Sequence, residues 1–235
     1  MDSRQWERVP DHVLYRLVRH NIQKLVEDHP GAADDIVPAC PDWRVRDLVA
    51  HLLHICEQAI ELLTGRATGP VQMSGAPAAG RGLPELLSTW RERGEELDRL
   101  VARSDDPRAG MLVHDAFTHE LDLRVAVGAP VPEGHSGYTG VLDLPVRGFF
   151  DRMAELGLPD LRIETPGREW ASGRSAAAVL TADHHDLYRS LTGRRTHEQI
   201  AALAWSADPT PWLPAFTRGP FRPPTRPAEG ILARS

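Results

Sequence analysis

Apolar residues recur every three or four positions in four segments of the N-terminal part of the chain, which is the spacing of amphipathic helices. We predict one helix from Asp11 to Pro30, a second after Asp42, a third after residue 82, and a fourth that ends at Gly128. Asp11 and Asp42 are expected to cap the first two. The positions predicted to face a common core are Leu14, Leu17, Val18, Ile22 and Leu25; Val45, Leu48, Leu52, Ile55, Ala59 and Leu63; Leu86, Leu87, Trp90, Leu97, Leu100 and Val101; and Leu112, Ala116, Leu123 and Ala126. Four such helices predict a bundle, a fold that builds metal sites from side chains on facing helices.

The pattern changes after a loose stretch at about residues 129–142. A helix from about Leu144 to Leu156 is followed by two strand-like runs, LRIET and AAAVLTA, with REWASG between them. DHHDLYRSL is predicted to be a helix, and Thr196 with Gln199 forms the capping-box pattern of another that runs through Leu203. This half is therefore predicted to be a small α/β module.

The fold class predicted from both halves is α+β. We expect a helix bundle over residues 1–142 and the α/β module over residues 143–235, whose proline- and arginine-rich tail wraps its surface. Residues 65–82 are rich in glycine, proline and alanine and are predicted to be a linker within the bundle.

Composition is ordinary for a globular protein, with 41% hydrophobic and 26% charged residues among 235. The formal net charge of −6 offers no overall attraction for nucleic acid or an anionic membrane, and no apolar run approaches the roughly 20 residues of a membrane span. No signal peptide is recognisable, so we expect a cytoplasmic protein without nucleic-acid or membrane partners. The two cysteines, Cys40 and Cys56, form no CxxC motif and are expected to be free thiols in packing roles.

Asp115 and His119 are the strongest candidates for chemistry. They lie four residues apart, hence one turn apart on the same side of the fourth helix, within its predicted apolar stripe. Burying a carboxylate and an imidazole is costly unless something compensates, and a divalent cation would compensate both.

His51, on the second helix, is the best third ligand. It lies at the edge of that helix's apolar stripe, about 60° from its centre, whereas His54 lies about twice as far away. His51, Asp115 and His119 would make a site of two histidines and one carboxylate. The residues alone leave open that these histidines are hydrogen-bonded core residues and that Asp115 pairs with an arginine. His114 lies on a weaker face, and His184 and His185 look like surface residues in the first turn of a helix.

Three segments resemble the mycothiol-dependent maleylpyruvate isomerase family, within the wider group of DinB-like metal-binding helix bundles. CPDWRVRDLVAHL is similar to the family's first signature, approximately C-P-G-W-T-V-R-D-L-V-A-H-L, with Asp42 in place of the usual glycine. THELDLRVAVG resembles the second signature, and LTGRRTHEQIAALAWSADPTPWLPAF resembles the C-terminal module. The resemblance places the family's metal-binding histidines on His51 and His119, and its acid, usually glutamate, on Asp115.

The resemblance implies a metalloenzyme that uses mycothiol as its thiol cosubstrate. Three protein ligands leave a coordination position open, as in catalytic zinc sites. The resemblance favours Zn²⁺, although such ligands also suit Fe²⁺ or Ni²⁺. A metal-activated thiolate would attack a small electrophile, either isomerising a cis double bond, as in maleylpyruvate, or remaining attached as in an S-transferase.

Supporting roles in orientation, substrate binding and packing are predicted for four other residues. Asp122, one turn beyond His119, could orient that histidine or a thiol amide. Arg218 and Arg222 are candidates for binding an anionic substrate, whereas Trp43 is expected to be a packing anchor at the helix start. Two rival functions stay open: a metal-dependent hydrolase of a thiol conjugate, and a non-catalytic metal-binding stress protein of DinB type.

Overall fold

The computed structural model describes residues 9–69, 80–104, 106, 108–132 and 134–230. The chain divides into two compact units, Met1–Val141 and Leu142–Ser235. Part of the predicted 65–82 linker, residues 70–79, lies outside the described residues. The α+β fold class, with a helical first unit and a sheet-containing second one, is confirmed.

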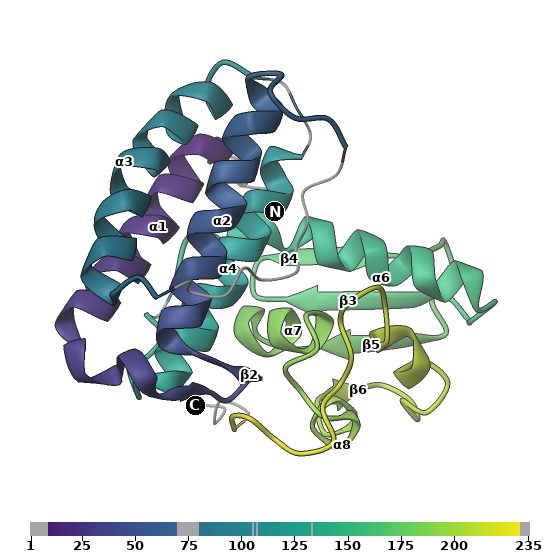
Figure 1. The fold of residues 1–235 in the computed structure, drawn as a ribbon. Helices are drawn as coiled ribbons and strands as arrows, with labels where there is room; N and C mark the ends of the chain where they lie inside the picture. Colours follow the sequence, from purple (N-terminus) through teal and green to yellow (C-terminus); the bar gives the residue numbers. More distant parts are fainter. Residues whose placement is uncertain (1–8, 70–79, 105, 107, 133, 231–235) are drawn as a thin grey trace. The chain divides into compact units, whose positions relative to one another are not determined.

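Four long helices build the first unit (Figure 1): α1 (Asp11–Asp28), α2 (Val45–Leu63), α3 (Leu83–Val101) and α4 (Ala109–Ala126). Each helix packs against two others, so that α1 and α2 both contact α3 and α4. The α2–α4 pair is the most loosely packed of the four. The shorter elements of this unit are η1 (Pro30–Asp34), β1 (Ile36–Val37), β2 (Cys40–Arg44) and α5 (Gly137–Val141).

The core of the bundle follows the predicted stripes with a few exceptions. Leu63, Leu100 and Ala126 are half-buried, and Leu17 is 38% exposed, so its assignment to the core was wrong. On α4, every residue from 112 to 123 is buried. The prediction of one apolar face on this helix was therefore wrong, because the helix buries its whole circumference there.

The predicted caps of the first two helices are also corrected. Asp11 is the first residue of α1 rather than its cap, a place where a carboxylate is favoured by the helix dipole. Asp42 is exposed on β2, which pairs antiparallel with β1, and α2 begins only at Val45. The backbone N–H of Arg44 donates to the Asp47 carboxylate at 3.0 Å, so a carboxylate inside the first turn stabilises the helix start.

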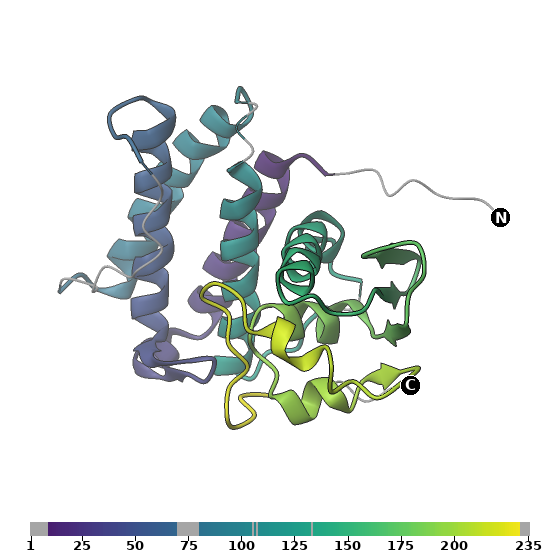
Figure 2. The same cartoon turned by 90° about the vertical axis from the view of Figure 1, so that its right-hand side faces the viewer.

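The second unit contains a four-stranded sheet in the order β4-β3-β5-β6. Its strands are β3 (Leu161–Thr165), β4 (Arg168–Ala171), β5 (Ala178–Thr181) and β6 (Ala204–Trp205), and its helices are α6 (Asp143–Glu155), α7 (His184–Leu191), α8 (His197–Ala201) and η2 (Leu213–Phe216). Strands β3 and β5 are parallel, and the other pairs are antiparallel. Figure 2 shows α6 and α7 on one face of this sheet.

The predictions for the second unit are confirmed for α6, β3, β5 and α7, but β4 and β6 were missed, and α8 ends at Ala201 and not at Leu203. The segment REWASG was left between strands, although it follows a Pro166–Gly167 pair that is a typical turn signal. Gly167 has φ of +76°, the left-handed conformation that such a turn needs, and Thr165 pairs with Arg168 across it. The capping box is confirmed, since Thr196 Oγ1 accepts from the Gln199 N–H at 3.2 Å.

A buried ionic cluster anchors the tail to α7. The Arg195 guanidinium donates to Asp186 at 2.7 Å and to Glu229 at 2.5 Å, and Arg189 also donates to Glu229 at 2.5 Å. Next to it, His185 is only 6% exposed, so its assignment to the surface was wrong. Burial and the charges of Arg189 and Arg195 lower the pKa of His185 to about 3.

Candidate metal centre

His51, Asp115 and His119 lie together between α2 and α4. The Nε2 atom of His51 is 3.5 Å from Asp115 Oδ2, and the Nε2 atom of His119 is 3.5 Å from Asp115 Oδ1. One ligand atom from each residue lies within 4.8 Å of the others. His51 is 1% exposed, and the other two are 8% exposed. We call these three residues the donor cluster.

The donor cluster contains buried polar atoms without a hydrogen-bond partner in the described part of the chain. Both ring nitrogens of His51 and Oδ2 of Asp115 lack a hydrogen-bond partner among the described residues. Buried polar atoms are normally paired, so three exceptions at one place indicate a missing partner. Two atoms that are each about 2.1 Å from a tetrahedral zinc ion lie about 3.4 Å apart, and the Nε2 atom of each histidine lies 3.5 Å from one of the two Asp115 carboxylate oxygens. The residues therefore fit a divalent cation.

The electrostatics of the donor cluster favour an ionised carboxylate. Burial by itself raises the pKa of Asp115, but the neighbouring imidazoles of His119 and His51 outweigh burial and hold the pKa below its usual range. An ionised carboxylate beside two imidazoles is the form that a cation binds.

Asp122 and Cys40 extend the donor cluster on the far side of His119. The fully buried Asp122 carboxylate lies 3.0 Å from Nδ1 of His119, and the Cys40 thiol donates to the same carboxylate oxygen at 3.9 Å. A proton on Nδ1 that is held by Asp122 leaves the lone pair of Nε2 directed toward the donor cluster. Cys40, His119 and Asp122 also satisfy the spacing of a ligand set by themselves.

Trp43 packs against both imidazoles. Its ring centroid lies 4.9 Å from that of His51 and 6.2 Å from that of His119. Trp43 and Cys40 both belong to β2, and sequence reasoning missed their proximity to the donor cluster. The motif CPDWR was recognisable, but the hairpin that folds it beside α4 was not.

The remaining candidates are not members of the donor cluster. His54 is half-buried on α2 and hydrogen-bonds to Gln58 at 2.5 Å, outside the donor cluster. Arg218 and Arg222 belong to the second unit, where Arg218 is half-buried with its guanidinium over the Phe221 ring and Arg222 is exposed. Burial lowers the pKa of Arg218.

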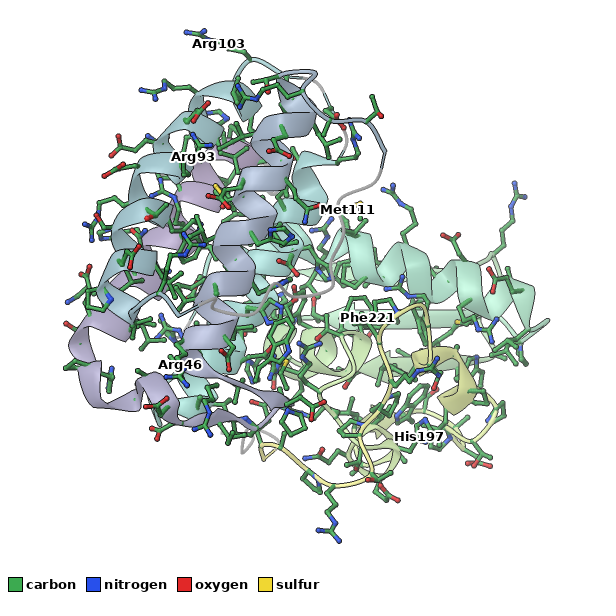
Figure 3. The ribbon with its side chains drawn as sticks, in the orientation of Figure 1. Arg46, Arg93, Arg103, Met111, His197 and Phe221 are labelled. Carbon is green, nitrogen blue, oxygen red and sulfur yellow. The ribbon has the colours of Figure 1, made fainter. Side chains whose placement is uncertain are left out.

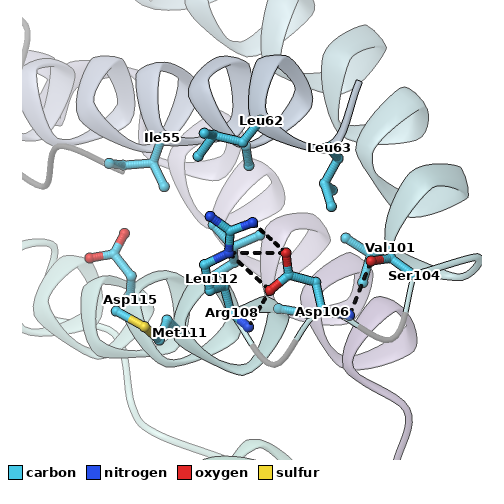
Figure 4. A pocket seen from close by; sticks show the side chains of 12 residues that line it. Ile55, Leu62, Leu63, Val101, Ser104, Asp106, Arg108, Met111, Leu112 and Asp115 are labelled. Atoms are coloured by element: carbon cyan, nitrogen blue, oxygen red, sulfur yellow. Dashed lines mark hydrogen bonds and ion pairs between the residues drawn. The ribbon is translucent and has the colours of Figure 1, made fainter. Parts of the chain in front are cut away.

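A cavity of about 160 Å³ begins at Asp115 and continues between α2 and α4. Figure 4 shows Asp115 at one end, Val101 and Ser104 at the other, and the paired side chains of Arg108 and Asp106 between them. Met111, labelled in Figure 3, is a lining residue that is 51% exposed. Asp115 is therefore the member of the donor cluster that lines this largely apolar cavity.

Comparisons with known proteins agree with the resemblance found in the sequence. Residues 15–128 match the family model described as the mycothiol maleylpyruvate isomerase N-terminal domain. The crystal structure of the mycothiol-dependent maleylpyruvate isomerase matches with a TM-score of 0.59 at 14% identity, covering 84% of this chain and 92% of that one. A histidine-to-alanine mutant of that isomerase matches with a TM-score of 0.57 at the same identity and coverage. No curated protein matches the chain by sequence.

In the described part of the chain, no helix is long and apolar enough to cross a membrane.

Proposed function

We propose that the protein is a metal-dependent enzyme that uses mycothiol to attack a small electrophile, because residues 15–128 match the model of the mycothiol maleylpyruvate isomerase N-terminal domain. The observation that supports this most is the donor cluster. It combines two imidazoles with one carboxylate, is almost fully buried, and contains three polar atoms that have no hydrogen-bond partner within the described ranges of the chain.

His51, Asp115 and His119 would hold the cation, and we propose zinc. Asp115 is one methylene shorter than the glutamate usual in the family, and its contacts of 3.5 Å to both histidines support its role in spite of the shorter arm. Asp122 holds the ring of His119 in place from the other side. Trp43 covers both imidazoles and limits the access of water. When bound, the cation would bind the thiol sulfur and lower the thiol pKa, so that a thiolate exists at neutral pH.

The reaction then follows from the chemistry of the thiolate. A sulfur lone pair forms the bond to the electrophilic carbon, while the π electrons of the substrate's double bond move to its conjugated carbonyl. In an isomerase, the intermediate rotates about the new single bond, the electrons return, and the same thiolate leaves. In a transferase, the intermediate takes up a proton and is released with sulfur attached. Neither route changes the oxidation state overall.

The second unit would contribute to substrate binding. We propose that Arg218 and Arg222 bind an anionic group of the substrate or of the thiol, because both are cations and they lie four residues apart in the tail. We further propose that residues 1–142 and 143–235 are separate domains and that the protein acts in the cytoplasm.

Metal content tests the donor cluster directly. We expect about one ion per chain in the wild-type protein and less than about a tenth of that in His51→Ala and His119→Ala. His54→Ala is the matched control, since it removes an imidazole from the same helix outside the donor cluster, and it should retain the metal. Equal loss in all three variants would contradict the ligand assignment.

Mycothiol and maleylpyruvate together test the reaction. Calorimetry should detect mycothiol binding to the metal-loaded protein and not to the stripped protein. Loss of maleylpyruvate at constant thiol would establish isomerisation, whereas loss of one thiol per electrophile would establish transfer. If the metal-loaded protein binds no mycothiol, the proposal fails, and the hydrolase or the non-catalytic metal-binding protein takes its place.

A further inference from the structure

We propose that the electrophile has an apolar group about as large as a benzene ring, and that this group binds in the cavity between α2 and α4. This inference rests on the proposed function, because the cavity and the donor cluster share Asp115. It assigns a substrate class that differs from small dicarboxylates such as maleylpyruvate.

The walls of the cavity are apolar along most of their length. From α2 it is lined by Ile55, Ala59, Leu62 and Leu63, and Leu112 of α4 faces them. An apolar cavity of about 150 Å³ is large enough to bind benzene. The cavity here, at about 160 Å³, therefore suits a phenyl ring or an alkyl group of similar size.

The charges that line the cavity do not suit a carboxylate. Arg108 is the one guanidinium among the described lining residues, and its Nε already donates to Asp106 at 2.9 Å and 3.0 Å. Its second terminal nitrogen donates to the same carboxylate at 2.5 Å. The remaining charged group among the described lining residues is Asp115, which the proposed cation would engage. Along the walls of this cavity, a substrate carboxylate would therefore find no unpaired guanidinium among the described lining residues.

The cavity is placed to hold the body of a molecule whose reactive carbon is at the donor cluster. Ile55 is one turn beyond His51 on α2, and Leu112 is about one turn before Asp115 on α4, so both helices continue from the donor cluster into the cavity wall. The loose packing of α2 against α4 accounts for the space. A substrate bound here would present its electrophilic end toward the thiol.

Two enones with the same reactive group test the substrate class. Benzylideneacetone has a phenyl ring where acetylacrylate has a carboxylate. With mycothiol, we expect kcat/KM, divided by the rate constant of the uncatalysed addition of mycothiol to the same enone, to be at least about tenfold higher for benzylideneacetone, the discrimination that a fitting apolar pocket can give. A preference for acetylacrylate would overturn the inference.

Filling the cavity should remove this preference. Leu62 is half-buried, so Leu62→Trp can occupy the cavity with little disturbance of the core. We expect it to lower kcat/KM for benzylideneacetone about tenfold, mainly through KM, and to leave acetylacrylate unchanged. Leu17→Trp, on the exposed side of α1, is the matched control and should affect neither substrate. Equal losses for both substrates would contradict a binding role for the cavity.

Binding without reaction separates this inference from the proposed function. Benzylacetone lacks the double bond and cannot react with a thiol. Calorimetry should show that it binds to the wild-type, His119→Ala and Leu17→Trp proteins and not to Leu62→Trp. If benzylacetone binds but no enone is consumed, the cavity assignment stands and the proposed function fails. If enones are consumed but benzylacetone does not bind, the cavity assignment fails alone.

Discussion

Replacing Asp122 by asparagine changes the support of a proposed metal ligand without changing the ligand itself. Asp122 is fully buried, and its carboxylate oxygen lies 3.0 Å from Nδ1 of His119. Asparagine has nearly the same volume and keeps an oxygen acceptor, so the ring of His119 can stay in place. What is lost is the negative charge that polarises the imidazole.

The size of the effect follows from that hydrogen bond. A bond to a charged group contributes about 1.5–3 kcal/mol, and a bond between neutral groups about 0.5–1.5 kcal/mol. The midpoints of these ranges differ by about 1.25 kcal/mol, which corresponds to about eightfold in metal affinity. Groups that orient metal-binding histidines generally contribute about 10–100-fold to affinity, so we expect a loss near the lower end of that range.

Competition with a chromophoric chelator measures this affinity, and Glu120→Gln is the matched control. Glu120 is a second fully buried carboxylate on α4, two residues away, and it accepts from Arg124 at 2.7 Å and pairs with His135 at 3.0 Å. Glu120→Gln should leave metal affinity unchanged but lower the free energy of unfolding by about 3 kcal/mol, because it disrupts a buried ionic pairing.

The two variants should therefore show opposite profiles. Unchanged metal affinity in Asp122→Asn, within about threefold, would show that the contact with His119 has no role in metal binding. Equal losses of metal affinity in both variants would show that a general disturbance of α4, and not the contact with His119, causes the loss.

Three further predictions concern other parts of the molecule. Burial and two arginines lower the pKa of His185 to about 3 from 6.5, so the folded protein excludes a proton that the unfolded chain binds below pH 6.5. The free energy of unfolding should be retained above pH 6.5 and fall by about 2 kcal/mol between about pH 7 and pH 5. In urea titrations, the free energy of unfolding of His185→Gln should depend less on pH than that of the wild-type protein. Burial raises the pKa of Cys56 to about 12, so iodoacetamide at about pH 8 should modify Cys40 and spare Cys56 in the folded protein, as mass spectrometry can establish. Glu229→Gln removes the shared carboxylate of Arg189 and Arg195, and we expect thermal unfolding to show a loss of about 3 kcal/mol; an unchanged melting temperature would argue against anchoring of the tail.

Local sequence was sufficient for most secondary structure. Local hydrogen bonds and side-chain contacts determine the helical periodicity, the capping box at Thr196 and the strand LRIET. These features can therefore be recognised from a short stretch of sequence. The turn at Pro166–Gly167 gave the same kind of signal for β4, although it was not used. The cap predicted at Asp42 was wrong because the hairpin of β1 and β2 occupies that position, and pairing between strands is not a local property.

Burial on α4 was not predicted correctly, although most core positions of the other helices were. The apolar stripe was used to select Asp115 and His119, yet α4 is buried around its whole circumference from residue 112 to 123. Their spacing of four residues, which places them on one side of the helix, was the informative part of that reasoning.

The amino-acid sequence by itself determined that two possible ligands stand one turn apart on α4, since a helix fixes that separation wherever it lies. The tertiary structure decided that His51 meets them, that Trp43 and Cys40 are close by, and that an apolar cavity opens beside Asp115. These outcomes depend on how α2 packs against α4 and how the β1–β2 hairpin folds beside them. Packing between distant segments is a sum of many weak contacts, which no short stretch of sequence contains.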